Sequence, residues 1–149
     1  MTWTATAPLV ARRPNGQMRA AEYGVAGAAG PAEMTVFYFG AGSGGSVQKN
    51  LDRWIGQIKQ ADGSDSKKVA KIDELVVGDI KVTRLDVSGA YGGGRPMGPA
   101  TAPVSDQRML GAIAEGPKGS VFFKLLGPAE TVASAEPAFV QMIKTFAPQ

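Results

Sequence analysis

Four polar side chains share one stripe of an expected helix and are the residues best placed to contact a partner. They recur at i, i+4, i+7 and i+11, which puts them on one face of an α-helix: Ser46, Asn50, Arg53 and Gln57. Arginine and amide groups make directional hydrogen bonds, and Trp54 beside them is an aromatic anchor of the kind that interfaces use. The stripe therefore predicts a binding surface, with internal hydrogen bonding and plain solvation as the alternatives.

A glycine-rich turn over residues 40–45, GAGSGG, stands immediately before this helix. It matches the G-x-G-x-x-G pattern that dinucleotide-binding folds place between a strand and a helix. The acidic residue that should follow about twenty positions later would be Asp62 or Asp65, inside a polar loop. Hairpins and not crossover helices come next, which argues against a doubly wound sheet.

Anion binding at the same turn does not depend on the fold. Backbone amides at a helix N-terminus suit a phosphate or carboxylate, and here they would come from Gly42, Gly44, Gly45 and Ser46. The alternative is that the glycines only permit a tight turn between strand and helix.

Composition removes several classes of chemistry. The chain has no cysteine and no histidine, which excludes thiolate and imidazole zinc sites, nucleophiles paired with histidine, and disulfides. No two carboxylates are paired by the linear order as an acid and a base. We therefore predict no catalytic residue, no metal site and no cofactor. The net charge of +3, without a basic run, does not favour nucleic acid as a partner.

The elements that must position these residues form an α+β domain. An apolar stripe predicts a helix from Ser46 through Ile58, and a second stripe predicts a helix after Pro128. Alternating or β-branched runs predict six strands, at residues 17–25, 36–39, 69–77, 80–87, 107–114 and 120–126. Because most of them follow one another as hairpins, we expect an antiparallel sheet of about six strands flanked by two helices.

Residues 1–149 are expected to form a single domain, with an extended N-terminal arm over residues 1–16 and a flexible loop over residues 89–106. The loop is rich in glycine and proline, and its Tyr91 and Arg95 are further candidates for partner contact. No apolar run reaches the roughly 18 residues that span a bilayer, so no transmembrane segment is predicted. The start does not read as a signal peptide.

Short segments spread over most of the chain carry a resemblance: residues 18–20, 37–40, 44–46, 127–128 and 131–132, with Asn50, Arg53, Trp54 and Gln57. They resemble a family of small uncharacterised bacterial lipoproteins and secreted domains, which has no established activity. The resemblance implies export to the periplasm or a lipid anchor on the precursor, with the signal removed; a cytoplasmic protein is the alternative.

The order of elements also resembles the PsbP-like fold, shared by an extrinsic photosystem II subunit and a Ran-binding nuclear import factor. That resemblance implies an α/β/α sandwich with an accessory or binding role. We therefore expect a non-enzymatic binding domain that presents the helix face and the loop to an unidentified protein or a small anionic partner. The alternative is a nucleotide- or phosphate-binding protein, or an enzyme, that uses the glycine-rich turn.

Overall fold

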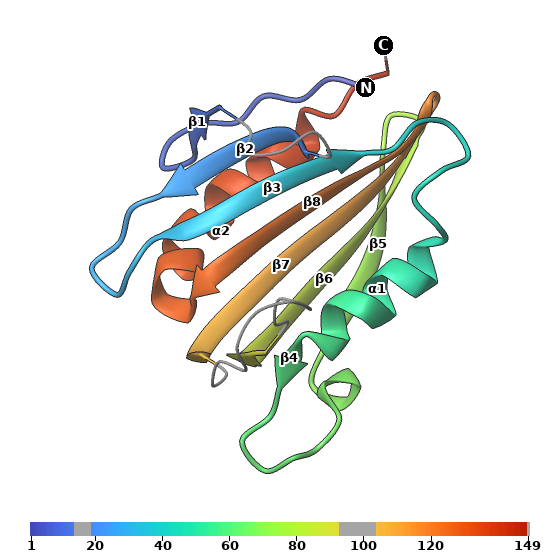
Figure 1. The fold of residues 1–149 in the computed structure, drawn as a ribbon. Coiled ribbons are helices and arrows are strands. Elements are labelled where there is room, and N and C mark those ends of the chain that lie inside the picture. Colours follow the sequence, from blue (N-terminus) through green and yellow to red (C-terminus); the bar gives the residue numbers. More distant parts are fainter. Residues whose placement is uncertain (14–18, 93–103, 149) are drawn as a thin grey trace.

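The computed structural model describes residues 1–13, 19–92 and 104–148. Two helices, one 3₁₀ turn (η1) and eight strands follow one another within these ranges (Figure 1). In chain order they are β1 (Val10–Arg12), β2 (Arg19–Val25), β3 (Ala32–Tyr38), α1 (Val47–Gly56), β4 (Ile58–Lys59), η1 (Ser66–Lys68), β5 (Lys71–Val77), β6 (Ile80–Tyr91), β7 (Val104–Gly116), β8 (Gly119–Pro128) and α2 (Ala129–Lys144).

The strands form one eight-stranded antiparallel sheet in the order β1-β2-β3-β8-β7-β6-β4, with β5 also paired to β6. All six predicted strands are present, so the α+β class and the antiparallel sheet are confirmed. The two further strands, β1 and β4, are too short to produce a recognisable alternation in the sequence. The sheet lies between the two helices, with α1 on one face and α2 on the other (Figure 1).

Each face of the sheet carries its own apolar core, because successive strand side chains point to opposite sides. Along β8, Phe122 packs in the core under α1, whereas Phe123 packs in the core under α2. The α1 side is filled by Leu51, Trp54 and Ile55 from the helix. The predicted apolar stripe is thus confirmed, but the helix ends at Gly56 and Ile58 enters β4, since glycine has low helical propensity.

The turn before α1 caps the helix as expected. The hydroxyl of Ser46 accepts a hydrogen bond from the backbone amide of Lys49 at 3.1 Å. The strand that leads into the turn, β3, has antiparallel neighbours on both sides, β2 and β8. In the described sheet this turn is therefore not set among the parallel strands of a dinucleotide-binding fold.

Strands extend into both ends of the predicted loop 89–106, because β6 runs to Tyr91 and β7 begins at Val104. Arg95 lies outside the described residues. Within the predicted N-terminal arm, Thr2 bridges to Ala147, and β1 adds to the edge of the sheet. None of the described helices is long and apolar enough to cross a membrane.

Candidate functional site

Most of the described residues of the predicted binding surface line one groove between α1 and the sheet. The groove consists of two hollows of about 180 and 260 Å³, which share Phe37 of β3 and Lys124 of β8. The first is lined also by Phe39, Arg53, Trp54, Gln57 and Phe122. The second is lined also by Glu33, Thr35, Tyr91 and Leu126. Four residues that sequence analysis singled out, Arg53, Trp54, Gln57 and Tyr91, are thereby brought together.

Lys124 holds a positive charge in the middle of this groove. Its ammonium donates a hydrogen bond to Oε1 of Gln57 at 2.6 Å and lies 5.6 Å from the centre of the Tyr91 ring. This residue was not predicted from the sequence, although it is the one charged side chain in the apolar run VFFKLL of residues 121–126. Because side chains alternate along a strand, Lys124 lies on the same face as Phe122, under α1, where the groove gives its ammonium access to polar partners.

The first half of the polar stripe holds the turn and the helix together. Asn50 is 2% exposed, and its Nδ2 donates to the carbonyls of Gly44 and Ser46 at 2.8 Å each. Its Oδ1 accepts a hydrogen bond from Nη2 of Arg53 at 2.6 Å, which ties the Arg53 side chain to the buried Asn50. Ser46 and Asn50 thus make contacts within the protein, and Arg53 and Gln57 line the groove. Partner contact by the whole stripe stays a prediction.

Packing explains one glycine of the turn. Gly44 has φ +95°, and a Cβ there would lie 2.9 Å from ring atoms of both Phe39 and Phe122. Gly42 and Gly45 also have positive φ, +74° and +82°, but a Cβ would meet nothing within 4 Å at Gly42 and only Asn50 at 3.5 Å at Gly45. Anion binding at these amides stays a prediction.

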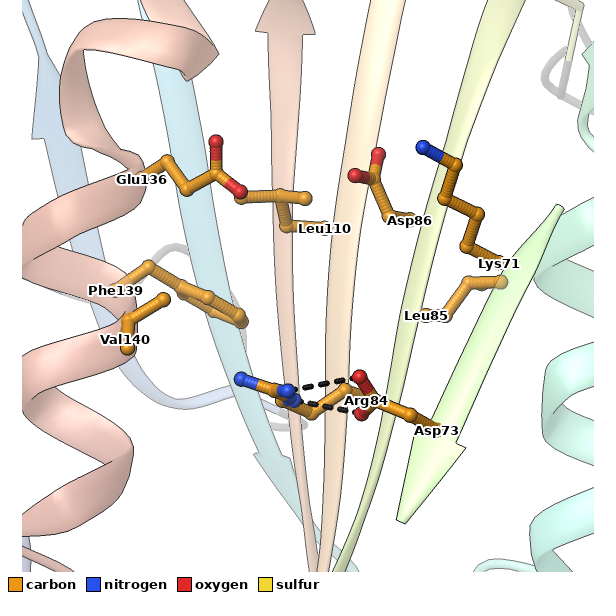
Figure 2. A pocket seen from close by; sticks show the side chains of 9 residues that line it. All are labelled: Lys71, Asp73, Arg84, Leu85, Asp86, Leu110, Glu136, Phe139 and Val140. Atoms are coloured by element: carbon orange, nitrogen blue, oxygen red, sulfur yellow. Dashed lines mark hydrogen bonds and ion pairs between the residues drawn. The ribbon is translucent and has the colours of Figure 1, made fainter. Parts of the chain in front are cut away.

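A separate hollow, of about 160 Å³, lies on the opposite face of the sheet, between α2 and the strands β5 to β7 (Figure 2). Its floor is apolar, formed by Leu110 and Phe139. At one end Nε and Nη2 of Arg84 donate to the two carboxylate oxygens of Asp73 at 2.7 and 2.8 Å. This bidentate pair fixes the two side chains against each other across β5 and β6.

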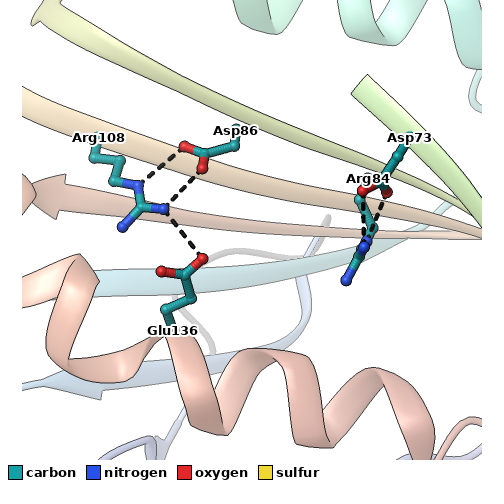
Figure 3. Close-up of polar contacts among 5 residues, drawn as sticks. All are labelled: Asp73, Arg84, Asp86, Arg108 and Glu136. Carbon is teal, nitrogen blue, oxygen red and sulfur yellow. Dashed lines mark hydrogen bonds and ion pairs between the residues drawn. The ribbon is translucent and has the colours of Figure 1, made fainter. Parts of the chain in front are cut away.

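Arg108 of β7 binds two acidic residues that line this hollow, Asp86 and Glu136, and so joins three elements (Figure 3). It donates to both carboxylate oxygens of Asp86 on β6 at 2.9 and 2.7 Å, and to Glu136 on α2 at 3.1 Å. The hydrogen bonds to Asp86 raise the pKa of the Arg108 guanidinium above its usual value, against the opposing effect of burial. The sequence did not reveal this cluster, because strand pairing and the docking of α2 bring the three residues together.

These ion pairs are typical of contacts that stabilise a fold, and not of an acid–base pair in a catalytic site. Asp73, Asp86 and Glu136 each bind an arginine, so these carboxylates are already engaged by contacts within the protein. Among residues 1–13, 19–92 and 104–148, no three His, Cys, Asp or Glu side chains gather as metal ligands would.

Comparison with known proteins places the fold but not the function. No family model and no curated protein matches the chain. A solved structure is similar over 95% of this chain and 97% of its own, with a TM-score of 0.57 and 14% sequence identity. It is PA94 from Pseudomonas aeruginosa, a protein of unknown function that is described as a candidate regulator. At that identity the similarity shows a shared fold alone.

Proposed function

We propose that the protein is a non-enzymatic binding domain that holds a carboxylate-bearing ligand in the groove beside α1. One observation carries the proposal: Arg53 and Lys124 line the same groove, over a floor that includes Phe37 and Leu126. The cationic groups suit a carboxylate, and the aromatic and aliphatic floor suits the apolar body attached to it. The ligand is thus a small organic acid or an acidic side chain of a protein.

The arrangement of the groove supports orientation of the ligand. Lys124 is held by Gln57 on α1 and by the Tyr91 ring, and Arg53 is held by Asn50. Side chains fixed in this way lose less conformational entropy when a ligand binds. The composition supports a role without covalent catalysis, because the chain lacks the thiol and imidazole groups that most nucleophilic mechanisms use.

A matched pair of probes tests the proposal: 4-phenylbutyrate, and 4-phenylbutanamide, which has the same body without the charge. Amide chemical shifts of the ¹⁵N-labelled protein should change on β3, β8 and α1 with the acid. The uncharged probe should bind at least about tenfold more weakly, since a hydrogen bond to a charged group is worth roughly 1.5–3 kcal/mol. Equal binding of the two probes would contradict the proposal.

Variants locate the binding. Lys124→Met keeps the length of the side chain and removes its charge, so the acid should bind about tenfold more weakly. Arg53→Ala and Gln57→Ala should also weaken the binding of 4-phenylbutyrate. Lys49→Met is the control, because Lys49 is an exposed residue of the same helix that does not line the groove. Wild-type affinity in Lys124→Met would place the ligand elsewhere.

Inorganic phosphate and ATP, added in the same titration, test the alternative site at the glycine-rich turn. Shifts confined to residues 42–46 would favour a phosphate-binding turn over the groove. Export, a lipid anchor and membership of the PsbP-like fold remain predictions from the resemblances; fractionation of cells that express the full-length gene tests the first two.

A further inference from the structure

Strand β5 forms an open edge of the sheet. It pairs with β6 in an unbroken register from Lys71 opposite Asp86 to Val77 opposite Ile80. In the part of the chain that the structure describes, no strand pairs with its other side. Natural proteins usually protect such edges with proline, a bulge, outward charges or a very short strand. The opposite edge, β1, has three residues, but β5 has seven.

Both acidic residues of β5 contact basic residues of the neighbouring strand in its own sheet. Asp73 binds Arg84, and Glu74 lies 3.7 Å from the ammonium of Lys81; both partners belong to β6. The side chains left exposed beside Glu74 on the same face are β-branched and apolar. Ile72 is 47% exposed and Val76 is 68% exposed. The strand therefore combines free backbone groups with apolar side chains at i and i+4, which is the pattern of a strand that accepts another strand.

We propose that this edge pairs with β5 of a second copy of the chain, antiparallel and about a two-fold axis through Glu74. In this register all residues of the two strands overlap, and Ile72 of each copy faces Val76 of the other. A shift by two residues in either direction would place Ile72 or Val76 opposite Glu74 and lose these pairs. The register is thus self-complementary, as a two-fold interface requires.

The two Glu74 side chains meet at the axis, and each brings the Lys81 that it already contacts, so the charges there are balanced. A contact made by one edge strand is small compared with the roughly 1,200 Å² or more that stable complexes bury. The dimer is therefore weak and depends on protein concentration.

Single cysteines test the register directly, because the chain has no cysteine of its own. Glu74→Cys places two thiols at the axis, where paired Cα atoms lie about 4.5–5.5 Å apart, within reach of a disulfide. Ile72→Cys is the control on the same strand and face, since its two copies would be about 13 Å apart along the strands. In a glutathione redox buffer we expect a cross-linked dimer from Glu74→Cys and not from Ile72→Cys.

A mixture of Ile72→Cys and Val76→Cys should form the cross-linked heterodimer that neither variant forms alone. Sedimentation equilibrium measures the dimer association constant without a cross-link. Val76→Lys should lower this constant about tenfold or more, because it places a charge against an apolar side chain. Val10→Lys, on the opposite edge, should leave it unchanged. A wild-type monomer at all concentrations, or equal cross-linking of Ile72→Cys and Glu74→Cys, would overturn the proposal.

Discussion

Replacing Gly44 with alanine tests whether the turn before α1 is shaped by packing. The residue has φ +95°, which costs an L side chain about 1–2 kcal/mol. The new Cβ would lie 2.9 Å from Phe122 and 2.9 Å from Phe39, and overpacking of this kind typically costs about 1–3 kcal/mol. Together they predict a loss of about 2–5 kcal/mol in the free energy of unfolding. That is a large part of the roughly 5–15 kcal/mol that stabilises a typical domain.

Urea denaturation followed by far-UV circular dichroism measures the loss. Gly42→Ala is the matched control, because Gly42 lies in the same turn with φ +74° and a Cβ there meets nothing within 4 Å. Its free energy of unfolding should fall only by the cost of the positive φ, about 1–2 kcal/mol. The difference between the two variants isolates the contact with the rings. If Gly44→Ala costs no more than Gly42→Ala, the turn does not pack on Phe39 and Phe122 and the reasoning is refuted.

Three further substitutions probe the sheet, each by denaturant unfolding. Arg108→Lys should lower the free energy of unfolding by about 1–3 kcal/mol, because lysine cannot reproduce the bidentate bond to Asp86. Arg84 is more exposed, so Arg84→Lys should lower it by less than about 1 kcal/mol. Equal losses in the two variants would contradict this reasoning. Thr83→Val should raise the free energy of unfolding by about 1 kcal/mol, since the buried hydroxyl has no hydrogen-bond partner within the described residues. A lower stability of the variant would show that the hydroxyl has a partner. Gly111→Ala should cost about 1–3 kcal/mol and shift tryptophan emission, because its Cβ would lie 2.7 Å from the Trp54 ring; an unchanged spectrum would contradict this.

The fold was largely predictable because its signals are local. The strands of both hairpins and β3 show in alternation or β-branched runs, and the apolar stripe of α1 and the cap at Ser46 depend on spacings within one helix. Where the pattern was too short, as in β4, or where Gly56 ended the helix early, the local signal did not suffice.

The site was only partly predictable because it depends on pairing between distant segments. Arg53 and Gln57 could be placed on one helix face, but Lys124 reaches them only because β8 lies beneath α1. Arg108 meets Glu136 only after β7 pairs with β6 and α2 docks on the sheet. Long-range contacts of this kind leave no periodic trace in the sequence.

Two strands, β7 and β6, separate the groove residue Lys124 on β8 from the open edge at β5, and this separation has a consequence for binding. The helix packs over β6, β7 and β8, with the groove toward β3 and with β5 beyond β6 (Figure 1). A ligand at Lys124 and a second copy at β5 share no contact residue, and between them lies a continuous layer of hydrogen-bonded strands. Coupling between two sites requires that each ligand favours a different state of the protein. Since the residues that line the groove and those of β5 do not overlap, we expect saturation with 4-phenylbutyrate to leave the dimer association constant from sedimentation unchanged. A change beyond the error of the measurement would show that α1 transmits strain between the two surfaces.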